Sequence, residues 1–333
     1  MNRFRSISRA LAVPHRGFWA TTLAITAIDA AWIVGAGLAI EPLGFSIAAI
    51  IAALLLAAAA FWAVVKPEPT LRGMALSTAA LLSFTVSIAL LHYLTATLAQ
   101  PLVDPHLVAA ETALGFDWRG HLEFLKTHPV VARGLALAYH SSGPQVALVV
   151  IVLSAVRRLG RLWAFVRLFA ATLLVVIVVS AFFPAEGPYA FYAPQEIVPS
   201  RLETIGGTWH LDPLSRLRRG EVSIISLADI RGLATFPSFH VCLAMITAWA
   251  LAPIKIVGPL IVLLNLAVIV ATVGAGGHYL PDVLAGWILG IGALAYQTLK
   301  HRRRSRRTHV SAMASPAISR SWRTRSAVIR APS

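Results

Sequence analysis

Long apolar runs constrain this chain more than any other feature. Between Leu162 and Phe183 the only charged residue is Arg167, and a helix needs about 20 apolar residues to cross the hydrocarbon core of a bilayer. The chain is 57% hydrophobic and 13% charged, with a mean hydropathy of +0.73, which lies outside the range of water-soluble domains. The runs do not alternate polar and apolar residues, so they predict membrane-spanning helices and not the strands of a barrel.

The apolar segments predict an all-α, polytopic membrane bundle of about eight transmembrane helices. The expected spans are residues 18–40, 45–65, 73–98, 134–156, 162–183, 239–251, 256–273 and 279–299. We expect three regions along the chain. Residues 1–72 form an N-terminal extension with two transmembrane helices, residues 73–299 form a six-helix core, and residues 300–333 form a basic, disordered cytoplasmic tail.

The net charge of +15 would suit a nucleic-acid partner, but the positions of the basic residues indicate a membrane instead. About a third of the 29 basic residues follow Leu299, and most of the others flank apolar segments. Because basic residues concentrate on the cytoplasmic side, both termini are expected there, in the cell (inner) membrane. The mixed polar and apolar residues 101–133 predict short amphipathic helices in the membrane interface.

Two short stretches carry the residues that are able to do chemistry. A glycine-rich turn, Gly274–Gly277, is followed by His278 and Asp282, which are four apart at the start of an apolar segment and therefore share one face of a helix. The aspartate is then able to fix the histidine's tautomer and raise its basicity. The upstream stretch, with Ser238 and His240, also opens an apolar segment. The predicted topology brings both stretches to the extracytoplasmic side.

This set of residues suits phosphoryl transfer. An unprotonated histidine can attack phosphorus, a second histidine can protonate the leaving alkoxide, and a serine hydroxyl can donate to a phosphoryl oxygen. Helix starts add free backbone N–H groups that favour a bound phosphate. The turn glycines, Gly277 among them, would allow the backbone to approach that anion closely. His210, His240 and His278 lack the spacing of metal ligands, so no metal is expected.

The two stretches resemble motifs of the type 2 phosphatidic acid phosphatase superfamily of membrane lipid phosphatases and phosphotransferases. Its Pro-Ser-x-His motif matches Pro237–His240, and its His-x-x-x-Asp motif matches His278 to Asp282, followed by Gly286. The Gly-Gly-His-Tyr form of the third motif, at residues 276–279, resembles the form found in the branch of inositol phosphorylceramide synthase-like phosphotransferases.

The resemblance implies a role for each motif residue. His278 would be the nucleophile, Asp282 its orienting partner, His240 the general acid and Ser238 a phosphate ligand. It also implies a lipid phosphate substrate, a phosphohistidine intermediate, no cofactor, and a catalytic core within residues 73–299.

Two phosphate-binding cations of the family pattern are replaced in this chain. The first motif should lie at the end of the fifth helix, but residues 183–189 contain no basic residue, and Thr272 stands where the third motif usually carries an arginine. An uncompensated phosphate would cost several kcal/mol of transition-state stabilisation. Arg231 is the first candidate replacement and Arg201 the second. Tyr189 is either a residue that lines the site or part of the loop alone.

The sequence leaves the reaction and two other functions open. Water as the acceptor would give a phosphatase, and an alcohol would give a phosphotransferase. A lipid-translocating or transport protein is an alternative, with Asp29, His92 and His140 as its intramembrane polar residues, although such residues more often form hydrogen bonds within a bundle. Another alternative is a relative that binds phospholipid with weakened catalysis, suggested by Thr272 and the missing first motif.

Overall fold

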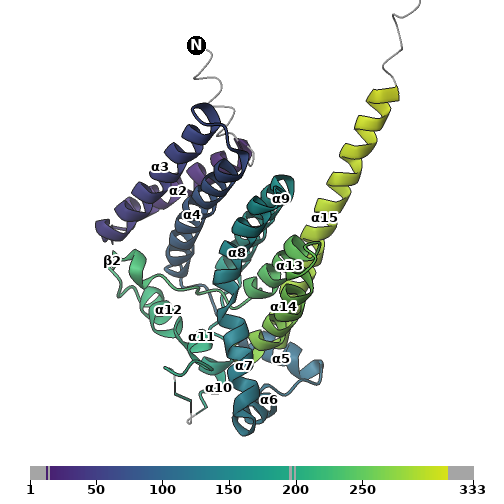
Figure 1. The fold of residues 1–333 in the computed structure, drawn as a ribbon. Helices are drawn as coiled ribbons and strands as arrows, with labels where there is room; N and C mark the ends of the chain where they lie inside the picture. Colours follow the sequence, from purple (N-terminus) through teal and green to yellow (C-terminus); the bar gives the residue numbers. More distant parts are fainter. Residues whose placement is uncertain (1–12, 14–15, 195–196, 199, 314–333) are drawn as a thin grey trace, which may run out of the picture. The chain divides into compact units, whose positions relative to one another are not determined.

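Helices make up nearly all of the regular structure in the computed structural model (Figure 1). The described residues are 13, 16–194, 197–198 and 200–313. The chain divides into two compact units, residues 1–293 and residues 294–333. The candidate site and all the packing considered below lie in the first unit.

Six helices of the described residues are long and apolar enough to cross a membrane. They are α2 (Arg16–Gly35), α3 (Pro42–Val64), α4 (Pro69–Ala96), α9 (Leu159–Phe182), α14 (Val257–Gly274) and the part Leu280–Arg302 of α15 (Leu280–Met313). A seventh crossing is formed if α7 (Pro129–His140) and α8 (Ser142–Ala155), which meet at 48°, are one bent span. The apolar α13 (Phe239–Leu251) is shorter. The expected all-α polytopic bundle is confirmed.

Shorter elements occupy the segments between the long helices. Residues 101–133 form α5 (Asp104–Ala113) and α6 (Trp118–Thr127), as their amphipathic pattern predicted. The long polar segment after α9 contains α10 (Pro188–Tyr192), α11 (Ile205–Thr208), α12 (Leu211–Arg218), the strand β2 (Ile224–Ile225) and the 3-10 helix η1 (Leu227–Asp229). The sequence did not predict these small elements, because each is too short for a clear periodicity.

The first span ends earlier than expected. We predicted a helix to residue 40, but α2 ends at Gly35, and Gly37 takes a positive φ of 65° in the turn that follows. Residues Ala39–Ile40 form β1, which pairs in parallel with Ile224–Ile225 of β2. This backbone pairing removes the last expected helical residues and ties the N-terminal helices to the loop that precedes α13.

The C-terminal helix continues beyond the expected start of the tail. α15 extends to Met313, so the boundary that we placed at residue 300 lies within a helix. Arginine and lysine are good helix formers, and arginine-rich sequence therefore does not by itself end a helix. The rest of the expected tail, residues 314–333, lies outside the described residues.

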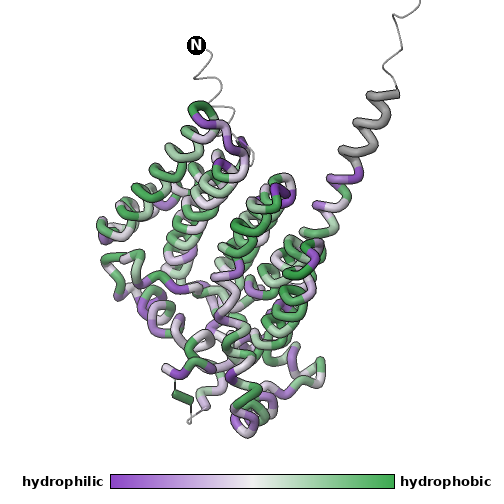
Figure 2. Tube along the Cα trace, in the orientation of Figure 1, coloured by the Kyte–Doolittle hydropathy of each residue, from purple (hydrophilic) through white to green (hydrophobic). Residues whose placement is uncertain are grey.

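Apolar side chains cover the outside of the long helices as well as the core. Figure 2 shows hydrophobic residues along α3, α9 and α14, with hydrophilic residues gathered at helix ends and in loops. On α14 the exposed stripe consists of Leu260, Leu263, Leu266 and Val270. Their spacing puts them on one helix face, which in water would be a large unfavourable surface. Lipid contact explains this stripe, and the chain is an integral membrane protein.

Close packing of α13 against the start of α15 positions the two stretches that carry chemistry. The backbone N–H of Ser238 donates to the carbonyl of Asp282 (3.1 Å), and the thiol of Cys242 donates to the carbonyl of Gly286 (3.1 Å). A Cβ at Gly286 would press against the carbonyl of Ser238 and lie 3.1 Å from Cβ of Val241. Glycine is therefore needed for the approach of the two helices.

We predict that Gly286→Ala destabilises the protein while Gly292→Ala does not. The new methyl group at 286 meets backbone, whereas a Cβ at Gly292 has no atom within 4 Å. Overpacking of this kind costs about 1–3 kcal/mol, and Gly→Ala at an open helix position is neutral or stabilising. Thermal unfolding of the two variants in detergent would show this. Equal melting temperatures would contradict the proposed role of Gly286.

Candidate active site

The two sequence motifs meet in a line of hydrogen bonds. Nδ1 of His278 lies 3.3 Å from Oδ2 of Asp282, and Nε2 of His278 lies 3.3 Å from Oγ of Ser238. All three residues are buried. Since the carboxylate accepts the proton of Nδ1, Nε2 presents its lone pair and accepts from the serine hydroxyl.

A second histidine faces the first. The ring centroids of His240 and His278 are 6.4 Å apart, at an interplanar angle of 62°. Nδ1 of His240 lies 3.3 Å from the hydroxyl of Tyr139, and the two rings pack with centroids 4.4 Å apart. Tyr139 belongs to α7 and therefore fixes the orientation of His240 from a third helix. The sequence analysis did not identify Tyr139, because an aromatic residue in a span usually belongs to the core.

The two histidines line a cavity of about 130 Å³. The lining includes the rings of His240 and His278, together with those of His92, His210 and Tyr139. It also includes apolar side chains of the membrane-spanning helices α4 and α9, namely Ile88, Leu173, Val176 and Ile177. The cavity has room for a phosphate-sized group, and its lining combines polar ring atoms with hydrocarbon.

Burial sets the protonation of the nucleophile candidate. It lowers the pKa of His278 to about 4 and that of His210 to about 4. His278 is therefore an unprotonated imidazole at neutral pH, with its free electron pair on Nε2. This is the form in which a histidine acts as a nucleophile.

Carboxylates occupy the start of α15, contrary to our expectation that phosphate would bind there. The N–H of Tyr279 donates to Oδ2 of Asp282 (3.0 Å), and the N–H of Leu280 donates to Oε2 of Glu111 (2.7 Å). Acidic groups and phosphate compete for the same donors and the same positive end of the helix dipole. The helix start therefore orients Asp282, and these two N–H groups are not free to bind a phosphate.

The glycine turn is likewise packed against protein. The N–H of Gly277 donates to the carbonyl of Gly274, and a Cβ on Gly277 would lie 2.7 Å from Cα of Gly207. The small size of Gly277 allows backbone-to-backbone packing, and its predicted role in binding substrate stays a prediction. Tyr189 fills the space beside this turn, and its hydroxyl donates to the carbonyl of Gly274 (2.9 Å). It lines a different pocket from the histidines.

The two arginine candidates do not line the histidine cavity. The guanidinium of Arg231 donates to the carbonyls of Ala228 (2.7 Å) and Ile230 (3.2 Å). Arg201 lines a second pocket, of about 570 Å³, with Tyr189 and Gly274. Thr272 is fully buried, and its hydroxyl donates to Ile269 of its own helix. None of these side chains takes the place of the missing phosphate-binding cations in this conformation.

Asp104 joins the loop after α9 to the nucleophile turn. Its carboxylate accepts from the N–H groups of Glu186 (3.0 Å) and Gly187 (2.8 Å) and from the hydroxyl of Tyr279 (3.0 Å). It is 4% exposed. The carbonyl of Glu186 in turn accepts from Nε2 of His210 (2.9 Å). One buried carboxylate thus positions both His210 and the residue next to His278.

The other intramembrane polar residues have separate environments. Asp29 is 2% exposed, and neither of its carboxylate oxygens has a hydrogen-bond partner in the described part of the chain. The expectation that Asp29 pairs within the bundle is therefore wrong for the part of the chain that the structure describes. Nε2 of His140 lies 3.0 Å from the carbonyl of Leu202, which agrees with its interpretation as a hydrogen-bonding residue.

These features define an integral membrane protein whose paired histidines suit the transfer of a phosphoryl group. The family model of the PAP2 superfamily matches residues 105–296, which is more than half of the chain. The chain therefore belongs to the PAP2 superfamily, and this membership indicates a phosphatase or phosphotransferase. The matched segment contains Ser238, His240, His278 and Asp282 but not His92. No curated protein and no solved structure matches the chain.

We predict that Asp104→Asn weakens activity and stability, although the residue lies outside the motifs. The carboxylate accepts three hydrogen bonds, and an amide would turn one acceptor into a donor that faces another donor. The cost is about 2 kcal/mol for bonds to a charged group. Asp117→Asn is the control, since Asp117 is exposed and makes no capping hydrogen bond. Thermal unfolding and turnover of both variants test this, and equal behaviour would contradict it.

Proposed function

We propose that the protein cleaves a phosphate ester of a membrane lipid through a phosphohistidine on His278. One observation carries the proposal. Nε2 of His278 is backed through Nδ1 by Asp282, contacts the Ser238 hydroxyl, and faces the ring of His240 across a cavity. The nucleophile and the proton donor thus line one phosphate-sized space, and the orienting acid and the serine hydroxyl contact the nucleophile.

The reaction proceeds in two displacements. Nε2 of His278 attacks phosphorus, an N–P bond forms, and the bond from phosphorus to the lipid oxygen breaks. Protonated His240 gives its proton to the departing alkoxide, while Asp282 stabilises the positive charge that develops on the His278 ring. In the second displacement an acceptor hydroxyl gives its proton to His240 and attacks phosphorus. The N–P bond then breaks and free His278 returns.

The walls of the cavity favour a lipid as substrate. Side chains of α4 and α9 that line the cavity, among them Ile88 and Val176, belong to spans that also contact the bilayer. An amphiphile enters such a site with its phosphate among the histidines and its hydrocarbon beside the apolar walls. Water as acceptor makes the protein a phosphatase, and an alcohol makes it a phosphotransferase, as in the inositol phosphorylceramide synthase-like branch. Comparing phosphate release with transfer to an added alcohol distinguishes the two.

We predict that His278→Gln lowers turnover of lipid phosphates by more than about 1,000-fold, because the covalent intermediate cannot form. Wild type incubated with lipid phosphate that is radiolabelled at phosphorus and quenched in alkaline detergent should carry a label that is stable to alkali and lost in acid, and the variant should not. His106→Gln is the control, because this histidine is exposed on α5. Normal turnover by His278→Gln would overturn the assignment. Transport in proteoliposomes without turnover of any lipid phosphate would favour the transport alternative.

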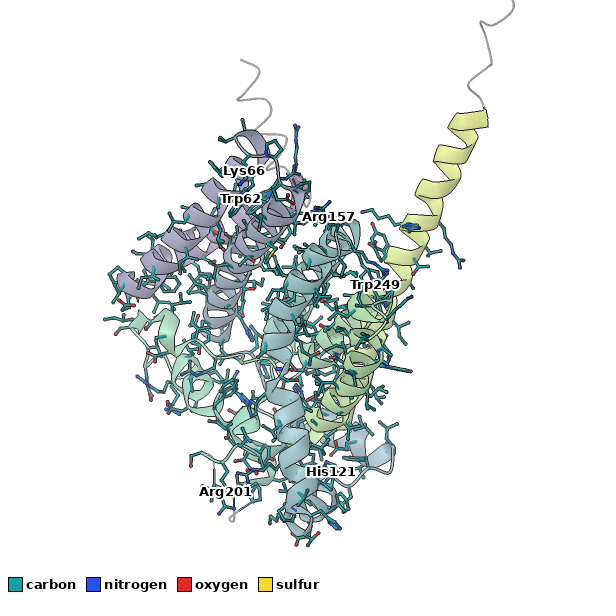
Figure 3. All side chains as sticks on the ribbon, viewed as in Figure 1. Trp62, Lys66, His121, Arg157, Arg201 and Trp249 are labelled. Atoms are coloured by element: carbon teal, nitrogen blue, oxygen red, sulfur yellow. The ribbon has the colours of Figure 1, made fainter. Side chains whose placement is uncertain are left out.

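We propose that the active site lies on the extracytoplasmic face of the cell membrane, with both termini cytoplasmic. The distribution of basic residues supports this orientation. Lys66 and Arg157 lie at one end of the first unit, and Arg201 lies at the other end (Figure 3). Arg201 is on the same loop system as the histidine cavity, since His210 follows α11 directly.

Cysteine labelling tests the orientation. We predict that Arg201→Cys reacts with an impermeant maleimide added to intact cells, and that Lys66→Cys reacts only after lysis. Both positions are exposed, and the native Cys242 is buried, so the unmodified protein gives the background. The reverse labelling pattern would invert the topology and place the site in the cytoplasm.

A further inference from the structure

Four histidines line the candidate active-site cavity, although the proposed mechanism uses two. His92 comes from α4 and His210 from the segment between α11 and α12, and both face the space that His240 and His278 line. The described residues that line this cavity include no lysine, arginine, aspartate or glutamate. A phosphate bound there would have histidines as its nearest candidates for positive charge.

His92 has no structural task that explains its position. It is 6% exposed, and neither ring nitrogen has a hydrogen-bond partner among the described residues, although its helix is a membrane span. A buried polar group without a partner costs free energy. The ring borders the cavity, so an entering ligand can supply the missing bond. His92 also lies before the segment matched by the family model.

A hydrogen bond from the Nε2 side of its ring holds His210 at the cavity. It is 2% exposed, and its Nε2–H donates to the carbonyl of Glu186 (2.9 Å). This bond fixes the tautomer and leaves Nδ1 as an acceptor in the neutral ring. Nδ1 can donate to an anion only after it takes up a proton. The Glu186 carbonyl belongs to the loop after α9, which is where the family's first cationic motif is missing.

We propose that His92 and His210 bind the substrate's phosphate as titratable cations, taking up protons when the anion enters the cavity. The inference rests on the proposed function and names the groups that hold the phosphate. A fixed lysine or arginine would be a buried, unpaired charge whenever the site is empty. Neutral histidines avoid that cost and become charged only beside the anion.

Burial and the neighbouring His278 lower the pKa of His210, whereas the Glu186 carbonyl and the Asp104 carboxylate raise it. His210 is neutral in the empty cavity because burial lowers its pKa. The other titratable groups near the pair are His278 on the glycine turn, His240 on α13, Tyr139 on α7 and the carboxylate of Asp104 on α5. Asp104 is engaged by three donors. The side chains of Glu186 and Arg218 lie near each other, and their opposite charges attract.

The ligand is a phosphate anion, either free or as part of a lipid headgroup. Proton uptake on binding means that affinity rises as pH falls, by up to about 10-fold per pH unit for each proton taken up. A phosphodiester is the best probe, because it keeps one negative charge over the whole range and contributes no titration of its own. Dimethyl phosphate and a short-chain lipid phosphodiester distinguish recognition of phosphate alone from recognition of the lipid.

Calorimetry on the detergent-purified full chain tests the inference. We expect both probes to bind wild type more tightly at pH 6 than at pH 8, with proton uptake seen as a heat that depends on the buffer. His92→Gln and His210→Gln should each weaken binding about 10-fold and reduce the pH slope. The glutamine at 210 can keep the donor to the Glu186 carbonyl. His106→Gln, at an exposed position of α5, should behave as wild type.

The outcomes separate this inference from the proposed function. If wild type binds and turns over lipid phosphates but its affinity does not change with pH, the inference fails and the proposed function stands. Variants at 92 and 210 with the wild-type affinity and slope would also overturn it. Weaker binding with an unchanged slope would show that the two histidines only shape the cavity. If wild type neither binds the probes nor turns over lipid phosphates, the inference and the proposed function both fail.

Discussion

The buried carboxylate of Asp104 is the interaction on which the geometry of the site depends. It accepts hydrogen bonds from two backbone N–H groups of the loop after α9 and from the hydroxyl of Tyr279. Within a membrane bundle, where water cannot satisfy exposed backbone groups, such a loop must find its partners in the protein. The same contacts fix His278, through its neighbour Tyr279, and His210, through Glu186. The contacts that hold the loop therefore also position the two histidines.

Carboxyl side chains, and not the substrate, accept the hydrogen bonds of the first backbone N–H groups of α15. Asp282 and Glu111 accept from its first N–H groups, and the second oxygen of each has no partner among the described residues. This arrangement places both carboxyl groups at the start of α15, with Asp282 on the Nδ1 side of His278 and away from Nε2. A helix start thus contributes to the chemistry indirectly, by orienting the aspartate.

Much of the fold followed from apolar length alone. The spans of α3, α9 and α14 were predicted to within about three residues at each end, because a membrane helix requires about 20 apolar residues. The end of α2 was missed, since its last residues pair with Ile224–Ile225, far away in the sequence. The continuation of α15 was missed because charge was taken to mean disorder.

The candidate site was likewise predicted only in part from the sequence. The juxtaposition of Ser238, His240, His278 and Asp282 was predicted from two local motifs and the topology that joins them. Their neighbours were not predicted, because Asp104, Tyr139 and His210 reach the site through tertiary contacts that no local pattern encodes. The search for a replacement cation went to Arg231 and Arg201 on the ground of charge, whereas both are turned elsewhere.

The missing cations are better understood from the cost of charge in an apolar setting. A phosphate site between α4 and α9 has hydrocarbon on two sides, and a permanent positive charge there needs a permanent partner. In a site where the anion comes and goes, groups that change their charge with occupancy avoid an unpaired ion in either state. Histidine is the side chain whose unperturbed pKa allows this near neutral pH. The replacement of fixed cations by His92 and His210 is then a consequence of where the site lies.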